Sequence, residues 1–191
     1  GGPAGYLGAE RAGHAGLNVA LIEERSLGGV CLNEGCIPTK TLLYSAKLYD
    51  GVAKGSKYGV SAEGLTIDHE SVIKRKDKVV RTLVAGVKSQ MKANKVTVFD
   101  ARGVITGKTN EGYTVKAGDE VLTGKKLLIT TGSVPAVPPI PGLKEGLDSG
   151  FVQTSREILD LKTVPNALCV IGGGAIGLLI AELFLHLAAN E

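Results

Sequence analysis

The sequence predicts an α/β fold in which a strand, a glycine-rich turn and a helix occur together twice. The first glycine turn stands at residues 1–5, and an apolar helix and a strand signal at 19–22 follow it. The second stands at residues 172–177, between a strand signal and another apolar helix. Between the two turns, apolar residues recur at three- and four-residue steps, which predicts a long amphipathic helix.

The composition indicates a packed globular protein. Hydrophobic residues make up 43% and charged residues 21% of the 191 residues, a length that suits one domain and part of another. A net charge of +3 argues against a dedicated nucleic-acid binder, and no apolar run is long enough for a membrane span. The chain opens inside a glycine turn without a signal peptide. An intact domain would not begin there, so we expect residues before Gly1.

Capping signals predict helices at 6–15, 38–52 and 69–94 and a short helix ending at Leu161. Pro38 suits the first helical position because its missing N–H needs no partner there. Asp68 is the predicted cap of the long helix. Thr154 or Ser155 is the predicted cap of the short one.

Short strand signals separated by turn residues follow the long helix, at 96–98, 103–105, 113–115 and 127–129. A further buried strand is predicted at 168–171, and Cys169 within it is interpreted as a packing residue. Four prolines between residues 135 and 141 form a stiff connector. We therefore expect one domain at residues 1–135 and the truncated start of a second at 136–191.

Residues 172–177 read GGGAIG, a complete G-x-G-x-x-G pattern of the kind that binds a dinucleotide. Gly172 permits the tight turn, Gly174 lets the backbone approach a pyrophosphate, and Gly177 lets the helix pack closely on the strand. A glycine-rich loop without a ligand is the alternative interpretation. The carboxylate that would select NAD over NADP is expected about 20 residues on, beyond Glu191.

The opening glycines fit the same pattern if its first glycine precedes residue 1, with Gly2 and Gly5 as the second and third. Glu23 follows Gly2 by 23 − 2 = 21 residues and ends a strand, where a ribose-binding carboxylate is expected. Two such turns predict two Rossmann-like domains. They also predict two bound dinucleotides, of which FAD and a nicotinamide cofactor are the economical pair.

The segment at residues 28–40 reads GGVCLNEGCIPTK and holds two cysteines five residues apart. A disulfide between Cys31 and Cys36 requires a bent backbone, because five helical residues rise about 7.5 Å, and Gly35 makes such a bend easy. With Pro38 as the first helical residue, Cys36 would lie just outside a helix N-terminus, which favours a thiolate. Cys31 would then be the thiol that exchanges. A metal site and two inert buried thiols are the alternatives, and zinc lacks its usual four ligands here.

This cysteine segment resembles the redox segment of the pyridine nucleotide–disulfide oxidoreductases. Its amino-acid sequence is most similar to that of the members that oxidise dihydrolipoamide. The resemblance covers essentially the whole chain, in the order of FAD turn, redox cysteines, flavin-closing segment, connector and nicotinamide turn. It implies a Rossmann-like FAD-binding domain followed by the start of a Rossmann-like NAD-binding domain.

The resemblance also implies roles for single residues. Cys36 would lie nearest the flavin, Cys31 would exchange with the substrate disulfide, and Lys40 would contact FAD near its reacting ring. An ordinary exposed lysine is the alternative for Lys40. Gly103 matches the adenine-side glycine of the family. The segment that closes over FAD, alternatively a simple strand-end turn, consists of Thr131, Gly132 and Ser133.

The sequence departs from the family pattern at two places. The family usually has a glutamate seven residues after the first glycine of the nicotinamide turn, where this chain has Leu179, and Glu182 follows three residues later. The catalytic histidine of the family, which acts across a dimer interface, belongs to a C-terminal part that this chain does not include. His186 is not its equivalent.

The implied reaction is the flavin-dependent oxidation of dihydrolipoamide to lipoamide with NAD⁺ as electron acceptor. The implied partners are a second copy of the chain and the lipoyl domains of 2-oxoacid dehydrogenase or glycine cleavage systems, in the cytoplasm or the mitochondrial matrix. Reduction of glutathione, mercuric ion or another disulfide by NAD(P)H is the nearest alternative. A non-catalytic nucleotide-binding piece of a larger complex is another.

Overall fold

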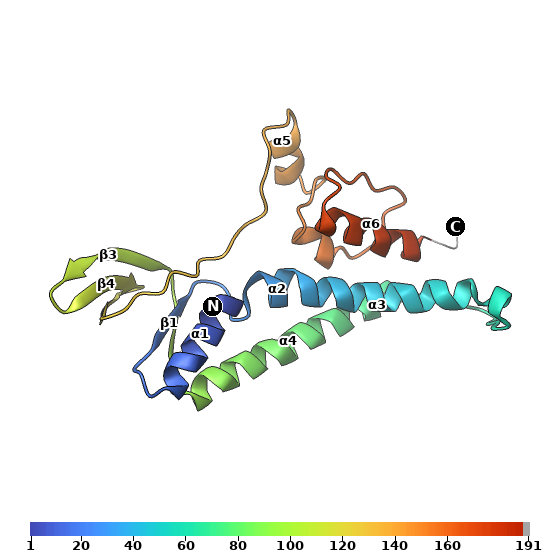
Figure 1. Ribbon diagram of the computed structural model, residues 1–191. Helices are drawn as coiled ribbons and strands as arrows, with labels where there is room; N and C mark the ends of the chain where they lie inside the picture. Colours follow the sequence, from blue (N-terminus) through green and yellow to red (C-terminus); the bar gives the residue numbers. More distant parts are fainter. Residues whose placement is uncertain (189–191) are drawn as a thin grey trace. The chain divides into compact units, whose positions relative to one another are not determined.

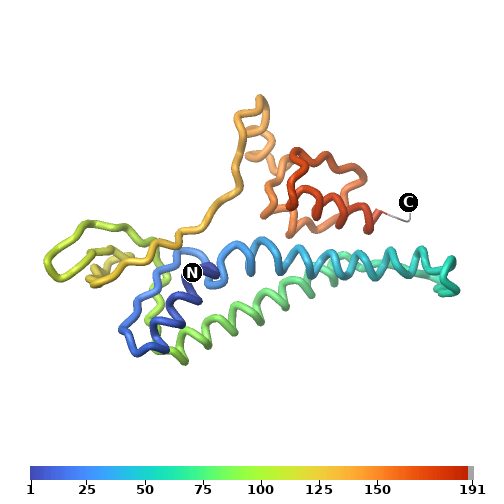
Figure 2. Tube along the Cα trace, in the orientation of Figure 1, coloured from blue at the N-terminus to red at the C-terminus, as the bar shows by residue number. Residues whose placement is uncertain are grey.

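The computed structural model describes residues 1–188 (Figures 1 and 2). These residues form two compact units. Unit 1 combines Gly1–Asn33 with Arg81–Ser133, and unit 2 combines Glu34–Val80 with the residues from Val134 onward. Among the described residues, no helix has the length and apolar composition needed to cross a membrane.

Unit 1 is built on a pair of parallel strands next to a helix. The first helix, α1 (Pro3–His14), leads into β1 (Ala20–Glu23), which pairs in parallel with β2 (Thr97–Asp100). Figure 1 shows α1 alongside β1. Parallel strands need a long crossover between them, and the crossover here includes the second half of α4 (His69–Ala93). The predicted cap of α4 is confirmed, because Asp68 accepts the backbone N–H of Ser71 at 3.2 Å.

The second sheet of unit 1 is an antiparallel meander of β3 (Gly103–Thr109), β4 (Gly112–Ala117) and β5 (Glu120–Gly124). The predicted turns at 110–112 and 117–119 connect these strands. The sequence did not predict β5, and the strand predicted at 127–129 is wrong. The turn at Gly118, with φ of +61°, folds the chain straight back so that residues 120–124 pair with β4. Residues 127–129 instead form no strand and pair with none of the described strands.

Unit 2 packs helices around an apolar core. Its elements are the first half of α4 together with α3 (Cys36–Ala53), η1 (Gly55–Tyr58), α5 (Leu143–Asp148), η2 (Glu157–Asp160) and α6 (Ala175–Leu187). The core joins the apolar faces of α3, η2 and α6 and consists of Leu42, Leu43, Ala46, Ile158, Leu159, Ile180, Leu183, Phe184 and Leu187. The short helix predicted to end at Leu161 is therefore a single 3-10 turn. Its N-cap residue is Arg156, so the cap predicted at Thr154 or Ser155 is wrong. Thr154 instead donates its backbone N–H and its hydroxyl to the Glu157 carboxylate.

The strand predicted at 168–171 is wrong, since these residues are exposed and lie outside any sheet. Cys169 is correspondingly an exposed thiol and not a packing residue. A buried parallel strand needs neighbours on both edges and both faces. The described residues place no strand next to 168–171. An apolar run is thus a necessary signal for a buried strand but does not by itself bury it.

Candidate redox and dinucleotide site

The first glycine turn positions α1 tightly against the sheet. Gly2 is the N-cap of α1, with φ −74° and ψ −176°, and the helix begins at Pro3. A Cβ on the buried Gly5 would lie 2.9 Å from Thr130 Oγ1 and 3.7 Å from Leu21 Cδ1. Only a glycine at residue 5 therefore lets the helix approach β1 and the extended chain at Thr130 this closely.

Glu23 ends β1, as the sequence predicts for a ribose-binding carboxylate. Its Oε1 accepts the backbone N–H of Arg25 at 2.8 Å. The charged carboxylate thus sits at the carboxyl end of the strand, beside the glycine turn.

The other residues predicted to contact FAD fall into both units. Gly103 begins β3, and a Cβ there would lie 3.4 Å from Ile22 on β1. Thr131, Gly132 and Ser133 are exposed at the end of unit 1, and Gly132 has a φ of +72°. Unit 1 therefore brings together the glycine turn, Glu23, Gly103 and residues 131–133, whereas Lys40 is an exposed residue of α3 in unit 2.

Two helices separated by Gly35 carry the cysteines. Cys31 is half-buried in α2 (Gly29–Glu34), a helix that the sequence did not predict, and Cys36 is the exposed first residue of α3. The expectation that α3 begins at Pro38, with Cys36 outside it, is wrong. Pro38 is tolerated at the third position because the first four N–H groups of a helix have no partner within it. Gly35, the N-cap of α3, provides the expected bend.

Asn33 stabilises the start of α2 and was not identified from the sequence. Its side-chain amide donates hydrogen bonds to the carbonyls of Leu27 and Gly29, both at 3.0 Å. These bonds fix the backbone that leads into the cysteine helix. An asparagine inside a helix usually disfavours it, which is the sequence signal that could have identified this role.

The second glycine turn has the backbone features expected of a dinucleotide turn. Gly172 has a φ of +112°, and a Cβ on Gly177 would lie only 2.2 Å from the Gly172 carbonyl oxygen. Gly174 is the N-cap of α6 with φ −75° and ψ 176°, nearly the conformation of Gly2 before α1. A Cβ on Gly174 would meet no atom within 4 Å. The first glycine is thus favoured by its positive φ and the third is required by packing, whereas a Cβ on the middle one would face open space.

Ion pairs between α3 and α6 lie near Leu179, the position at which this chain departs from the family pattern. Leu179 packs on the core of unit 2, and Glu182 bonds Lys47 at 2.7 Å. This hydrogen bond lowers the pKa of Glu182. His186 Nδ1 lies 3.0 Å from Asp50 Oδ2. The glutamate near position 179 is therefore paired with a lysine seven residues beyond Lys40.

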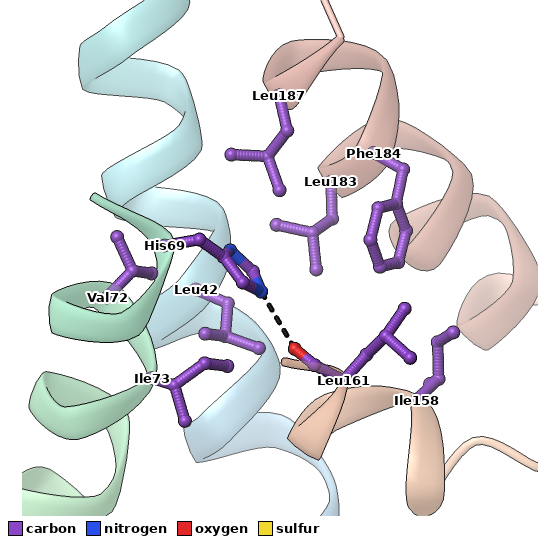
Figure 3. Close-up of a pocket in the computed structure, with 9 residues that line it drawn as sticks. All are labelled: Leu42, His69, Val72, Ile73, Ile158, Leu161, Leu183, Phe184 and Leu187. Carbon is purple, nitrogen blue, oxygen red and sulfur yellow. Dashed lines mark hydrogen bonds between the residues drawn. The ribbon is translucent and has the colours of Figure 1, made fainter. Parts of the chain in front are cut away.

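A small cavity between α3, α4, η2 and α6 is too small to be a substrate site. Figure 3 shows the nine side chains around it, including His69, whose Nε2 lies 2.8 Å from the Leu161 carbonyl oxygen. Its volume is about 10 Å³, space for no more than one water molecule. We interpret this region as core packing.

Comparison with known proteins agrees with these features of the chain. A profile of the pyridine nucleotide-disulphide oxidoreductases matches residues 1–190. Two glycine turns on an α/β scaffold and a cysteine pair between them define a dinucleotide-binding oxidoreductase, and the chain belongs to this pyridine nucleotide-disulphide oxidoreductase family. The family and fold class expected from the cysteine segment are thereby confirmed.

Among its relatives, the dihydrolipoyl dehydrogenase of Acholeplasma laidlawii is 45% identical over 185 residues, covering 96% of this chain and 54% of the relative. That of Chlamydia muridarum is 39% identical and covers all of this chain and 40% of the relative. The HOCl-induced flavoprotein disulfide reductase RclA of Escherichia coli aligns with a TM-score of 0.77 at 32% identity, over 97% of this chain and 38% of RclA. The chain thus spans about half or less of these relatives' lengths.

Proposed function

We propose that the protein to which this chain belongs oxidises dihydrolipoamide to lipoamide with NAD⁺ as acceptor, through Cys31, Cys36 and FAD. The observation that carries the proposal is the placement of two thiols on either side of the Gly35 bend, in a segment whose helix α2 begins against Gly2 of the Rossmann-type glycine turn. The 45% identity to a relative named dihydrolipoyl dehydrogenase supports the choice of substrate.

The residues present fit two dinucleotides. Gly2, Gly5, Glu23 and Gly103 in unit 1 supply a helix N-terminus and a strand-end carboxylate, the groups that hold a pyrophosphate and a ribose. The open space at Gly174 suits close approach of a second pyrophosphate to α6. We assign FAD to the first turn and NAD to the second. We also assign residues 131–133 and Lys40 to FAD binding, as the resemblance implies.

In the proposed reaction, a thiolate of dihydrolipoamide attacks the Cys31–Cys36 disulfide at Cys31 and releases Cys36 as a thiolate. The second substrate thiolate then attacks the mixed disulfide, which forms lipoamide and releases Cys31. One S–S bond breaks and one forms, so the protein gains the two electrons that the substrate loses. Bound FAD would supply the chemistry that passes these electrons on to NAD⁺ as a hydride.

The proposal extends to assembly and location. A homodimer would bring the catalytic histidine of one copy to the cysteines of the other, and the natural substrate would be carried on the lipoyl domains of 2-oxoacid dehydrogenase or glycine cleavage complexes. A bacterial protein would work in the cytoplasm. A eukaryotic one would work in the mitochondrial matrix, as the name of the Dictyostelium discoideum relative, 38% identical, indicates for that protein.

An anaerobic titration of the purified full-length protein with dihydrolipoamide, followed by visible absorbance, tests the proposal. We expect a flavin spectrum that gains a long-wavelength band on reduction, and the loss of this band in Cys36→Ser. Cys169→Ser is the matched control, because Cys169 is also an exposed thiol but lies outside the pair.

Two other outcomes would point elsewhere. Bound flavin that ignores dihydrolipoamide but responds to another disulfide with NAD(P)H would favour a reductase like RclA, to which the chain is 32% identical. Purified protein without flavin, in which Cys36→Ser changes nothing, would contradict the redox role and favour a nucleotide-binding part of a complex.

A further inference from the structure

A partly buried ion pair lies next to the exposed redox cysteine. Glu34 ends α2 and stands two residues before Cys36. Its Oε2 is 2.6 Å from Nε of Arg156, and both side chains are only 19% exposed. Because water is largely excluded from both groups, this pair interacts more strongly than an ordinary surface pair. All three residues belong to unit 2.

Local hydrogen bonds hold the turn that presents Arg156. The backbone N–H of Arg156 lies 3.3 Å from Thr154 Oγ1, and the Glu157 carboxylate accepts the backbone N–H of Thr154 at 2.8 Å. The Thr154 side-chain hydrogen bond, with the nearby Arg156 charge among the lesser causes, lowers the pKa of Glu157 below its usual value. Hydrogen bonds within residues 154–157 therefore hold the backbone at Arg156 in place, and its guanidinium extends from there to Glu34.

Glu34 stands close to the exposed Cys36 along the chain, because two residues separate their Cα atoms by no more than about 7 Å. In general, a carboxylate near a thiol disfavours the thiolate, whereas a helix N-terminus and a nearby lysine favour it. Cys36 begins α3, and Lys40 follows one turn along the same helix. A guanidinium paired with Glu34 offsets the charge of the carboxylate.

We propose that Arg156 is a positioning residue for the redox pair, which keeps Cys36 reactive by neutralising the Glu34 carboxylate next to it. The proposal rests on the proposed function, since Cys36 is the thiol that leaves and re-forms in the disulfide exchange. It assigns a task in the thiol chemistry to the segment 154–160, which follows the proline connector. Neither residue touches the substrate in this role.

The test measures alkylation of Cys36 in the reduced full-length protein by iodoacetamide between about pH 5 and pH 10, with the modified peptide quantified by mass spectrometry. We expect Arg156→Gln to raise the pH midpoint of Cys36 alkylation by on the order of half a pH unit, the size of the effect of one unit charge several ångströms away in a largely solvated setting. Arg156→Lys should stay near the wild type.

The two single variants should shift the pH midpoint of Cys36 alkylation in opposite directions. Glu34→Gln removes the carboxylate and leaves the positive charge of Arg156, so we expect the midpoint to fall. The double variant Glu34→Gln/Arg156→Gln should return to the wild-type midpoint. Lys47→Gln is the matched control, because it breaks another ion pair of α3 at a distance from Cys36 and should leave the midpoint unchanged.

A midpoint that does not move in Arg156→Gln, or that rises equally in the double variant, would overturn the proposal. If Arg156→Gln fails to fold by circular dichroism, the comparison of Glu34→Gln with the wild type still decides, since a fall is required. Alkylation needs neither bound flavin nor dihydrolipoamide. A failure of the lipoamide assignment therefore leaves this result readable, and a failure here leaves that assignment intact.

Discussion

The backbones of Gly29 and Gly2 are in close contact, since a Cβ on Gly29 would be 2.5 Å from the Gly2 Cα. This contact joins the first residue of the cysteine helix α2 to the N-cap of α1, the helix that follows the first glycine turn. A change at Gly29 would thus affect the proposed FAD turn and the redox segment together.

Gly29→Ala should destabilise the protein and weaken flavin binding. The alanine would have to adopt a φ of +62° and displace the Gly2 backbone, which together cost about 2 to 4 kcal/mol of unfolding free energy. Chemical denaturation and flavin retention during purification measure the two effects. Gly86→Ala, at an exposed position in α4 with no atom near its Cβ, is the control and should stabilise by about 0.5 to 1 kcal/mol.

Gly174→Ala and Gly177→Ala should separate binding from stability in the second turn. A Cβ on Gly174 meets nothing within 4 Å, so the variant should unfold like the wild type but bind NAD(H) at least about tenfold more weakly, because the methyl fills the space for the pyrophosphate. A Cβ on Gly177 would strike the Gly172 carbonyl, so that variant should lose stability. Calorimetric titration and thermal melts of both variants distinguish these outcomes. Equal stability losses would contradict this division of roles.

Asp68 should make the stability of α4 dependent on acid. Hydrogen bonds from the Ser71 hydroxyl and its backbone N–H lower the pKa of Asp68 below its ordinary value. Its contribution is therefore complete above that ordinary value and is lost as the pH falls through the lowered pKa. Asp68→Ala should melt below the wild type at neutral pH, with a gap that closes in acid below about pH 4.

Asp68→Asn is the matched control, because asparagine also caps helices but does not titrate in this range. It should stay close to the wild type near neutral pH and show no such closing gap against Asp68→Ala. A gap between wild type and Asp68→Ala that is independent of pH would contradict a titrating cap.

Lys76 should tolerate an apolar replacement better than the loss of its partner. Its side chain is 4% exposed and pairs with Asp160 and Asp77, which are 72% and 43% exposed, and it donates to the Leu159 carbonyl. Lys76→Met leaves two solvated carboxylates and the Leu159 carbonyl without the ammonium, but it also removes the buried charge, so it should cost less than about 1.5 kcal/mol. Asp160→Asn leaves a buried ammonium with a weaker set of partners and should cost about 1 to 3 kcal/mol. Urea denaturation measures the loss of unfolding free energy in each variant. A larger loss in Lys76→Met than in Asp160→Asn would contradict this explanation.

Local signals were sufficient for much of the fold. The glycines of both turns, the cap at Asp68 and the strands of the meander at 103–105 and 113–115 follow from the conformational preferences of a few neighbouring residues. The cysteine segment likewise predicted the family, which the profile match over residues 1–190 confirms. The sequence did not predict β5, because its pairing depends on a tight turn at Gly118, or α2, which Asn33 stabilises through bonds to Leu27 and Gly29.

By itself, the sequence determined which residues we assign to the chemistry: two cysteines around a glycine bend, a strand-end glutamate and two glycine turns of the dinucleotide-binding pattern. Only the tertiary structure decided which distant groups they meet, such as Gly29 against Gly2 and Arg156 on Glu34. It also decided that the apolar run at 168–171 is exposed. The physical reason is the distance along the sequence between the interacting residues. Turns and caps are encoded by adjacent residues, whereas burial and ion pairing depend on parts of the chain that are brought together only by folding.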